Sequence, residues 1–185
     1  HWKARLQIAA YVRKNNDIDW FKFVCGSDLT LSVLADADYA RTSNDRKSVS
    51  GVAVVLCGTA ISWKSSTQKC VTTATCETEY VALCDAATEA IFREMILVFL
   101  QPQLVGMCVD IFGENEGAMS IANNPSTASR SKHIDVKFQF IQGLVRSGEI
   151  RILDVETKDE DADILTKVLW RKAFMAHRAA LMNLV

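Results

Sequence analysis

Four carboxylates stand at comparable places in the sequence, each where a predicted strand ends or a predicted helix begins. They are Asp36, Glu79, Glu114 and Asp163. Carboxylates gathered from segments so far apart repel one another unless cations neutralise them. Hard oxygen ligands, in a chain with three histidines, favour Mg²⁺ or Mn²⁺. Two such ions about 4 Å apart can activate a water molecule and stabilise the leaving oxygen of a phosphodiester.

Each carboxylate alone also has an ordinary structural explanation. Asp36 and Asp38 follow the alternating segment from Leu31 to Ala35, and a strand that ended there would leave Asp38 in a turn. Glu79 in the first turn of a helix would favour the helix dipole. The prediction of a metal site therefore rests on the four positions together.

The elements that must position these residues form a predicted βββαβααβα order. Strands are predicted at residues 31–36, 49–57, 59–65, 107–113 and 149–155, with helices at 2–14, 76–100, 114–123, 133–145 and a last one whose first turn carries Asp163. Gly58 is predicted to turn a hairpin, and Trp63 to join the core, with a platform for base stacking as the alternative. Small residues share a face with Glu79, which would bring it to the sheet. The fold class is α/β, with a five-stranded mixed sheet of three antiparallel strands and two reached through helical crossovers.

Bulk properties indicate one domain with an appendage. A turn at residues 26–28 predicts a short N-terminal unit at 1–28 and the main domain at 29–185. The net charge of −1 gives no global basic field, and no apolar run is long enough for a membrane span. The six cysteines lack metal-binding spacing, and Cys57, Cys84 and Cys108 are predicted to be buried thiols. We expect an intracellular protein, and a start at His1 suggests a piece of a longer one.

Seven segments resemble the ribonuclease H domain of copia-class retrotransposon Pol polyproteins, joined to the tail of the reverse transcriptase. They read HWKARLQIAAYV, LADADYA, DRKSVSGVAVVLCGTAISWKS, CETEYVAL, ENEGAMSIANNP, SRSKHIDVKFQFI and DADILTK. Asp36, Glu79 and Asp163 match acidic positions of that family. The resemblance implies a ribonuclease H fold, two Mg²⁺ ions and hydrolysis of the RNA strand of RNA–DNA hybrids. It also implies that residues 1–28 are the reverse-transcriptase tail, and that the protein acts in the cytoplasm within virus-like particles.

Glu114 departs from the family, which usually has Asp at this place. The extra methylene moves the carboxylate by about one bond length, whereas catalytic geometry tolerates roughly 0.5 Å. Asp110, four residues back along the strand and about 13 Å away, is not expected to substitute. We expect weakened cleavage, with Mn²⁺ better tolerated than Mg²⁺; a domain without activity is the alternative.

Basic residues near predicted turns form candidate nucleic-acid contacts. They are Arg46, Lys47, Lys64, Lys69, Arg130, Lys132 and His133. Charges near hairpins are also commonly just solvated, and the segment around His133 could instead cap a helix through Ser131. The sequence therefore leaves both explanations open at these positions.

Three functions compete. The first is a metal-dependent endoribonuclease that acts on RNA–DNA hybrids in reverse transcription, with the polymerase portion of the polyprotein as partner. The second is a catalytically weakened or dead domain that binds nucleic acid or braces the polymerase. The third, a DNA-cutting integrase or resolvase, is disfavoured by the four carboxylates and the ADILTK ending.

Overall fold

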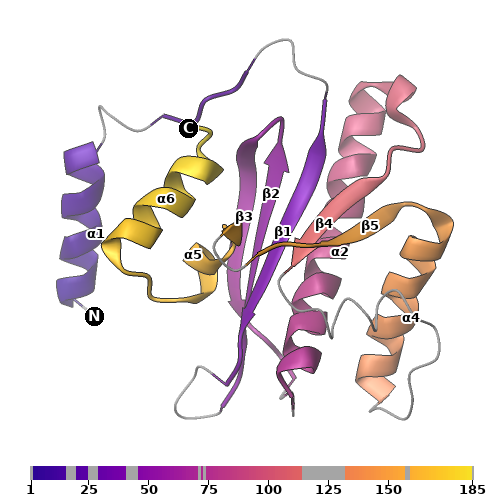
Figure 1. Cartoon of the computed structure of the whole chain (residues 1–185), viewed down its shortest axis with the longest axis horizontal. Coiled ribbons are helices and arrows are strands. Elements are labelled where there is room, and N and C mark those ends of the chain that lie inside the picture. The colour runs from indigo at the N-terminus through magenta and orange to yellow at the C-terminus, as the bar shows by residue number, and fades with distance from the viewer. Residues whose placement is uncertain are drawn as a thin grey trace.

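The computed structural model describes residues 2–15, 20–24, 29–40, 46–70, 72, 74–113, 132–156 and 159–184. Along the chain the elements are α1 (Trp2–Asn15), β1 (Leu31–Asp38), β2 (Val49–Leu56), β3 (Thr59–Thr67), α2 (Thr75–Leu100), the 3₁₀ turn η1 (Pro102–Leu104), β4 (Val109–Gly113), α4 (Lys132–Ser147), β5 (Ile150–Asp154), α5 (Asp163–Thr166) and α6 (Arg171–Leu181) (Figure 1). The helix predicted at residues 114–123 lies outside the described residues. The other predicted elements are confirmed with ends shifted by a few residues, except that the last predicted helical stretch is two helices, α5 and α6, rather than one.

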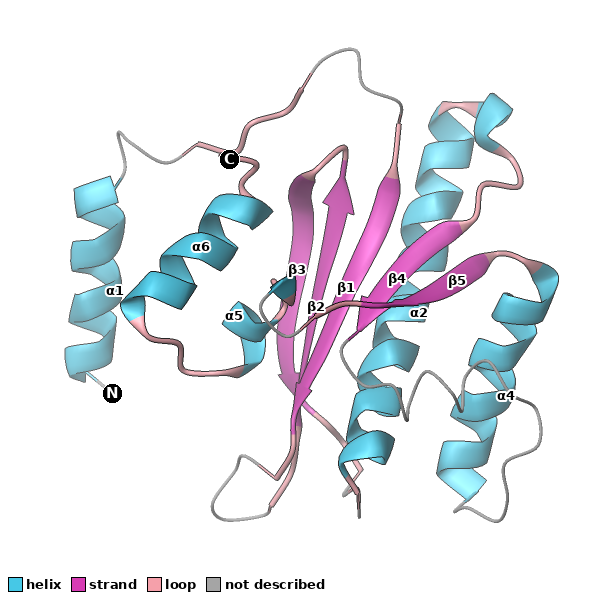
Figure 2. Cartoon of the chain, in the orientation of Figure 1, coloured by secondary structure: helices cyan, strands magenta, loops and turns pink. Residues whose placement is uncertain are grey.

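The five strands form one mixed sheet in the order β3-β2-β1-β4-β5 (Figure 2). β1 and β3 each pair antiparallel with β2, whereas β4 pairs parallel with both β1 and β5. The hairpin between β2 and β3 turns at Cys57 and Gly58, whose φ angles of 49° and 80° are both positive. Such turns match the twist of the flanking strands. The predicted sheet is confirmed.

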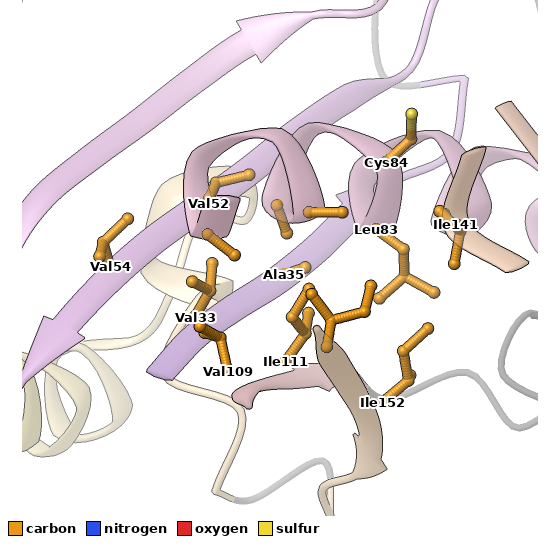
Figure 3. Close-up of a cluster of buried hydrophobic side chains, with 14 of the residues drawn as sticks. Val33, Ala35, Val52, Val54, Leu83, Cys84, Val109, Ile111, Ile141 and Ile152 are labelled. Atoms are coloured by element: carbon orange, nitrogen blue, oxygen red, sulfur yellow. The ribbon is translucent and has the colours of Figure 1, made fainter. Parts of the chain in front are cut away.

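One face of the sheet carries the core beneath α2 and α4. Val33 and Ala35 of β1 and Ile111 of β4 point into this cluster, together with Leu83 of α2 and Ile141 of α4 (Figure 3). The buried face of α2 includes four alanines with no exposed surface, namely Ala82, Ala86, Ala87 and Ala90. Small side chains let the helix backbone approach the strands closely, as the sequence predicted.

The side chains of β1 alternate between two environments. Val33 and Ala35 face α2, whereas Asp36 contacts α5. Because successive residues of a strand point to opposite faces, α5 lies on the face opposite to α2. This side of the sheet is where the candidate site forms.

The N-terminal segments pack beside α6 and β3. Tyr11 of α1 accepts a 2.7 Å hydrogen bond from Arg178, and its ring meets Phe174 edge-on at 5.9 Å between centroids. Farther along, the Lys22 carbonyl accepts a hydrogen bond from the Thr59 hydroxyl at 2.5 Å. Division of the chain at residue 28 stays a prediction.

Two predictions of burial are wrong in part. Trp63 is 57% exposed and stacks on Phe21, because β3 is an edge strand that only β2 adjoins in the sheet. Of the three cysteines expected to be buried, Cys84 is buried, Cys57 is half-buried and Cys108 is exposed. Cys108 immediately precedes the buried Val109 of β4, and successive side chains of an extended chain point to opposite sides.

Candidate active site

Asp36 is a buried carboxylate in the last part of β1, with 1% of its surface exposed. The Thr166 hydroxyl of α5 donates a hydrogen bond to its Oδ2. The ammonium of Lys167 lies 3.2 Å from Oδ1. Both oxygens of Asp36 therefore interact with residues 130 and 131 positions later in the chain.

Asp163 is the first residue of α5 and is also buried. Its Oδ1 lies 2.5 Å from the same Lys167 ammonium, across one turn of chain. Two buried carboxylates from distant segments thus share one cation. The structure therefore brings Asp36 and Asp163 together, and their roles as catalytic or metal-binding residues stay predictions.

Gly51 explains why α5 can lie so close to β1. It is the cross-strand partner of Asp36 in β2. A Cβ atom at Gly51 would lie 2.7 Å from Thr166 Cγ2 and 2.9 Å from the Cβ of Leu165. Such distances are well below carbon–carbon contact at about 3.5–4.0 Å. Only glycine leaves room for α5 at this place.

Two further contacts fix the start of α5. The buried Glu160 carboxylate accepts a 3.0 Å hydrogen bond from the backbone N–H of Ala162. Asp161 Oδ1 lies 2.9 Å from Nδ1 of the buried His177 on α6. Burial raises the pKa of Asp161, although the hydrogen bond with His177 opposes the rise. The segment that presents Asp163 is therefore tied to α6.

The ammonium of Lys167 is held in its charged form. Burial alone would lower the pKa of Lys167, but the hydrogen bond to Asp163 and the charge of Asp36 outweigh it, so the pKa is raised. The net effect is a stable cation between two carboxylates. The sequence reasoning missed Lys167 and Thr166 as site residues, although the i, i+4 spacing of Asp163 and Lys167 is a known signal for a helical ion pair.

Glu79 is carried on the first turns of α2, whose start is anchored by buried polar side chains. Gln68 donates hydrogen bonds of 2.8 Å to the Ser50 hydroxyl and 2.9 Å to the Thr78 carbonyl. The Thr78 hydroxyl, next to Glu79, hydrogen-bonds to the Thr72 hydroxyl. Glu79 itself is half-buried. Ala82, Ala86 and Ala90, which were predicted to share a face of α2 with Glu79, are fully buried.

The four predicted carboxylates do not form a complete cluster among the described residues. Asp36 and Asp163 meet, and Glu114 lies outside the described part of the chain. Across the described ranges, no group of three or more histidine, cysteine, aspartate or glutamate side chains is close enough to hold a metal ion. Asp110 is engaged elsewhere: Arg151 of β5 donates two hydrogen bonds to it, at 2.8 and 2.9 Å.

The donor set at Asp36 and Asp163 still suits a hard divalent cation. Their carboxylate oxygens and the neighbouring Thr166 hydroxyl are the ligand types that Mg²⁺ and Mn²⁺ prefer. Both carboxylates are buried, and one oxygen of each contacts the same ammonium, so the two side chains converge on one position.

A basic groove of about 890 Å³ lies between the end of β3, α2 and α4. Three lysines, Lys64, Lys69 and Lys137, and one carboxylate, Asp85, line it. The remaining lining is polar or apolar and uncharged: Ser66, Thr67, Cys70, Val81 and Val136. Lys64 and Lys69 belong to the predicted nucleic-acid contacts, whereas sequence reasoning missed Lys137.

The other predicted nucleic-acid contacts either do not line this groove or lie outside the described part of the chain. Arg46 is exposed and Lys47 is half-buried on the approach to β2. Arg130 lies outside the described residues, and the side chains of Lys132 and His133 are not described.

The fold belongs to the ribonuclease H class. It matches the N-terminal RNase H domain of a Mycobacterium tuberculosis protein, solved as a fusion with maltose-binding protein, with a TM-score of 0.54 and 14% identity. That match covers 81% of this chain and 96% of the other. LC11-RNase H1, solved in complex with an RNA/DNA hybrid, matches with a TM-score of 0.53 and 17% identity, over 74% of this chain and 94% of the other.

Among the sequence relatives are retrovirus-related Pol polyproteins from plant transposons. This chain is 35% identical over 177 residues to the polyprotein of transposon TNT 1-94 from Nicotiana tabacum, and 36% identical over 174 residues to that of transposon RE2 from Arabidopsis thaliana. Each match covers 94% of this chain but only 13% and 12% of the relative's length. No protein-family model matches the chain. The chain is therefore homologous to a short segment of these polyproteins and carries a ribonuclease H fold.

Among the described residues, no helix combines the length and apolar character that crossing a membrane requires.

Proposed function

We propose that this chain is the ribonuclease H unit of a retrotransposon polyprotein, which hydrolyses the RNA strand of RNA–DNA hybrids during reverse transcription. The observation that carries the proposal is the meeting of the buried Asp36 and Asp163 around one cation on a ribonuclease H fold. The Pol polyprotein relatives support a role in reverse transcription, with the polymerase portion of the same polyprotein as partner.

Asp36 and Asp163 would hold the divalent cation, with Glu79 and Glu114 as further proposed ligands. Bound Mg²⁺ or Mn²⁺ would supply Lewis-acid stabilisation of phosphate oxygens and a more acidic water molecule. The chain's own residues orient this site. Thr166 fixes the rotamer of Asp36 by donating to Oδ2, and Gly51 lets α5 bring Asp163 alongside.

The basic groove would bind the sugar–phosphate backbone of the hybrid. Lys64, Lys69 and Lys137 line it together, and their ammonium groups are suited to phosphate as point charges. Each phosphate contact that is removed should lower the magnitude of the slope of log affinity against log salt by about 1. We expect Lys64→Ala and Lys137→Ala each to show this change, with Lys172→Ala on the exposed side of α6 as the matched control.

The segment with Arg130, Lys132 and His133 is proposed as a second phosphate contact. The salt dependence of hybrid binding should weaken in the double variant Arg130→Ala, Lys132→Ala. An unchanged slope would remove this segment from the proposed binding surface.

The direct test is cleavage of an end-labelled RNA–DNA hybrid in Mg²⁺ and then in Mn²⁺. The unmodified chain should cut the RNA strand, and Asp36→Asn should not. Intact double-stranded DNA serves as the control substrate and should not be cut. Equal activity of the unmodified chain and Asp36→Asn would contradict the proposal, because the activity would then arise elsewhere.

Glu114 supports a second candidate, a catalytically weakened or dead domain that binds hybrid or braces the polymerase. Restoring the shorter side chain in Glu114→Asp separates the two. Faster cleavage by Glu114→Asp would mean that Glu114 impairs a working site. Binding of hybrid without cleavage by either protein would favour the binding domain. Unchanged activity in Glu114→Asp would contradict the expectation of impairment.

A further inference from the structure

Lys167 lies where the two buried carboxylates of the site face each other. Its Nζ is 3.2 Å from Asp36 Oδ1 and 2.5 Å from Asp163 Oδ1. Since Thr166 donates to the other oxygen of Asp36, both oxygens of this carboxylate contact α5 or the residue just after it. The ammonium therefore serves both carboxylates as a shared counter-ion.

We propose that Lys167 is a built-in competitor of the divalent cation, which stabilises the metal-free site and must leave the Asp36–Asp163 pair before metal binds between them. This inference rests on the proposed function, because it assumes that the same two carboxylates hold the metal. By this inference, Lys167 lowers the affinity of the site for metal.

The geometry allows the Lys167 ammonium either to contact the two carboxylates or to withdraw into solvent. Its side chain is 34% exposed, so the ammonium is at the boundary of solvent rather than enclosed. A lysine carries its charge on a flexible four-carbon stem and can withdraw it into water without moving the backbone. The carboxylates, by contrast, are buried and fixed by β1 and α5. The mobile partner in any exchange of cations is therefore the lysine.

The consequence for affinity follows from thermodynamic linkage. Ammonium and divalent cation bind the same oxygens, so each opposes the other by the same coupling free energy. Removal of the ammonium leaves two neighbouring buried carboxylates that repel, which lowers the stability of the metal-free fold and raises the affinity for metal. We expect a rise of about tenfold, within the usual range for coupled sites.

A different role for Lys167 makes the opposite prediction. If the lysine remained bound to Asp163 beside the metal and merely positioned that carboxylate, its removal would misplace a ligand. Metal affinity would then fall. The sign of the change in affinity thus distinguishes a competitor from a positioning residue.

The test is Mn²⁺ binding, followed by the electron paramagnetic resonance signal of free Mn²⁺ without nucleic acid. The proteins are the unmodified chain, Lys167→Met, which removes the charge at similar length, Asp36→Asn as the blank, and Lys172→Met as the matched control. We expect Lys167→Met to bind about tenfold more tightly than the unmodified chain, and Lys172→Met to bind equally. Equal or weaker binding by Lys167→Met, while the unmodified chain binds and Asp36→Asn does not, would overturn the inference and leave the proposed function intact. Absence of any binding that depends on Asp36 would overturn both.

A second measurement uses the unmodified protein and does not depend on the folding of a variant. Lysine acylation by a small activated ester is followed by peptide mass spectrometry, with and without Mg²⁺. Because Mg²⁺ would release the ammonium from the two carboxylates, the acylation rate of Lys167 should rise with Mg²⁺, whereas that of Lys172 should not. An unchanged rate for Lys167 at Mg²⁺ concentrations that saturate the site would overturn the inference.

Discussion

The substitution Gly51→Ala should damage the site without touching a proposed ligand. Its added Cβ would lie 2.7 Å from Thr166 Cγ2 and 2.9 Å from Leu165 Cβ. Neither conflict can be relieved at the end of a flexible side chain, because both atoms lie at or next to the Cβ positions of α5. A normal carbon–carbon contact needs about 3.5–4.0 Å, so α5 would have to withdraw by about 1 Å.

This displacement has two measurable consequences. Overpacking of this kind costs about 1–3 kcal/mol of unfolding free energy, which urea denaturation would detect. Because α5 carries Asp163, the retreat also moves a proposed ligand away from Asp36, and a misplacement of about 1 Å can cost about 100-fold in rate. We therefore expect the rate of hybrid cleavage to fall by more than the fraction of protein that unfolds under the conditions of the assay.

Gly143→Ala is the matched control, because a Cβ at this position of α4 would have no atom within 4 Å apart from its chain neighbours and the nearby backbone of its own helix. It should raise stability by about 0.5–1 kcal/mol, since alanine favours a helix interior over glycine. Cleavage should not change. The reasoning would be refuted if Gly51→Ala unfolded at the same urea concentration and cut hybrid at the same rate as the unmodified chain.

Three further outcomes follow from individual contacts. Thr166→Val should cost about 1–3 kcal/mol by denaturation, since it removes the hydroxyl that donates to the buried carboxylate of Asp36 at nearly unchanged volume, and Thr166→Ser should keep most of the stability. Burial raises the pKa of Cys84, so at pH 8 iodoacetamide should alkylate the exposed Cys108 long before Cys84, and equal rates by mass spectrometry would contradict this burial. Asp110→Ala should leave cleavage unchanged, because this carboxylate pairs with an exposed arginine of β5; a loss of activity would place Asp110 in the site instead.

The strands and the hairpin could be predicted because the sequence patterns that specify them lie within short segments of the chain. Alternation of apolar residues in β1 and the two-residue turn at Gly58 follow directly from side-chain periodicity and turn chemistry. The alanine face of α2 likewise indicated close packing on the strands. Such patterns require no knowledge of which distant segment lies opposite.

Errors arose where burial depends on the position of an element in the whole sheet. Trp63 has the composition of a core residue, but β3 is at the edge, and the indole instead stacks on Phe21. Cys108 reads as part of an apolar strand, yet it precedes the first residue of β4. Sequence periodicity gives the face of a strand, whereas the order of strands decides whether this face is covered.

Only part of the site could be predicted, because the contacts between its residues also depend on how distant elements pack. Asp36 and Asp163 could be chosen as acidic residues at element ends, but their joint hold on Lys167 depends on the depth at which α5 lies against the sheet. That depth is set by Gly51, which in the sequence resembles any glycine of a strand. Two buried carboxylates that meet in this way need a positive charge from the moment the fold forms, because their repulsion is present before any metal binds. Lys167, one helical turn after Asp163, supplies that charge from the same segment. The same ammonium therefore stabilises the fold and, by our proposal, opposes the binding of metal.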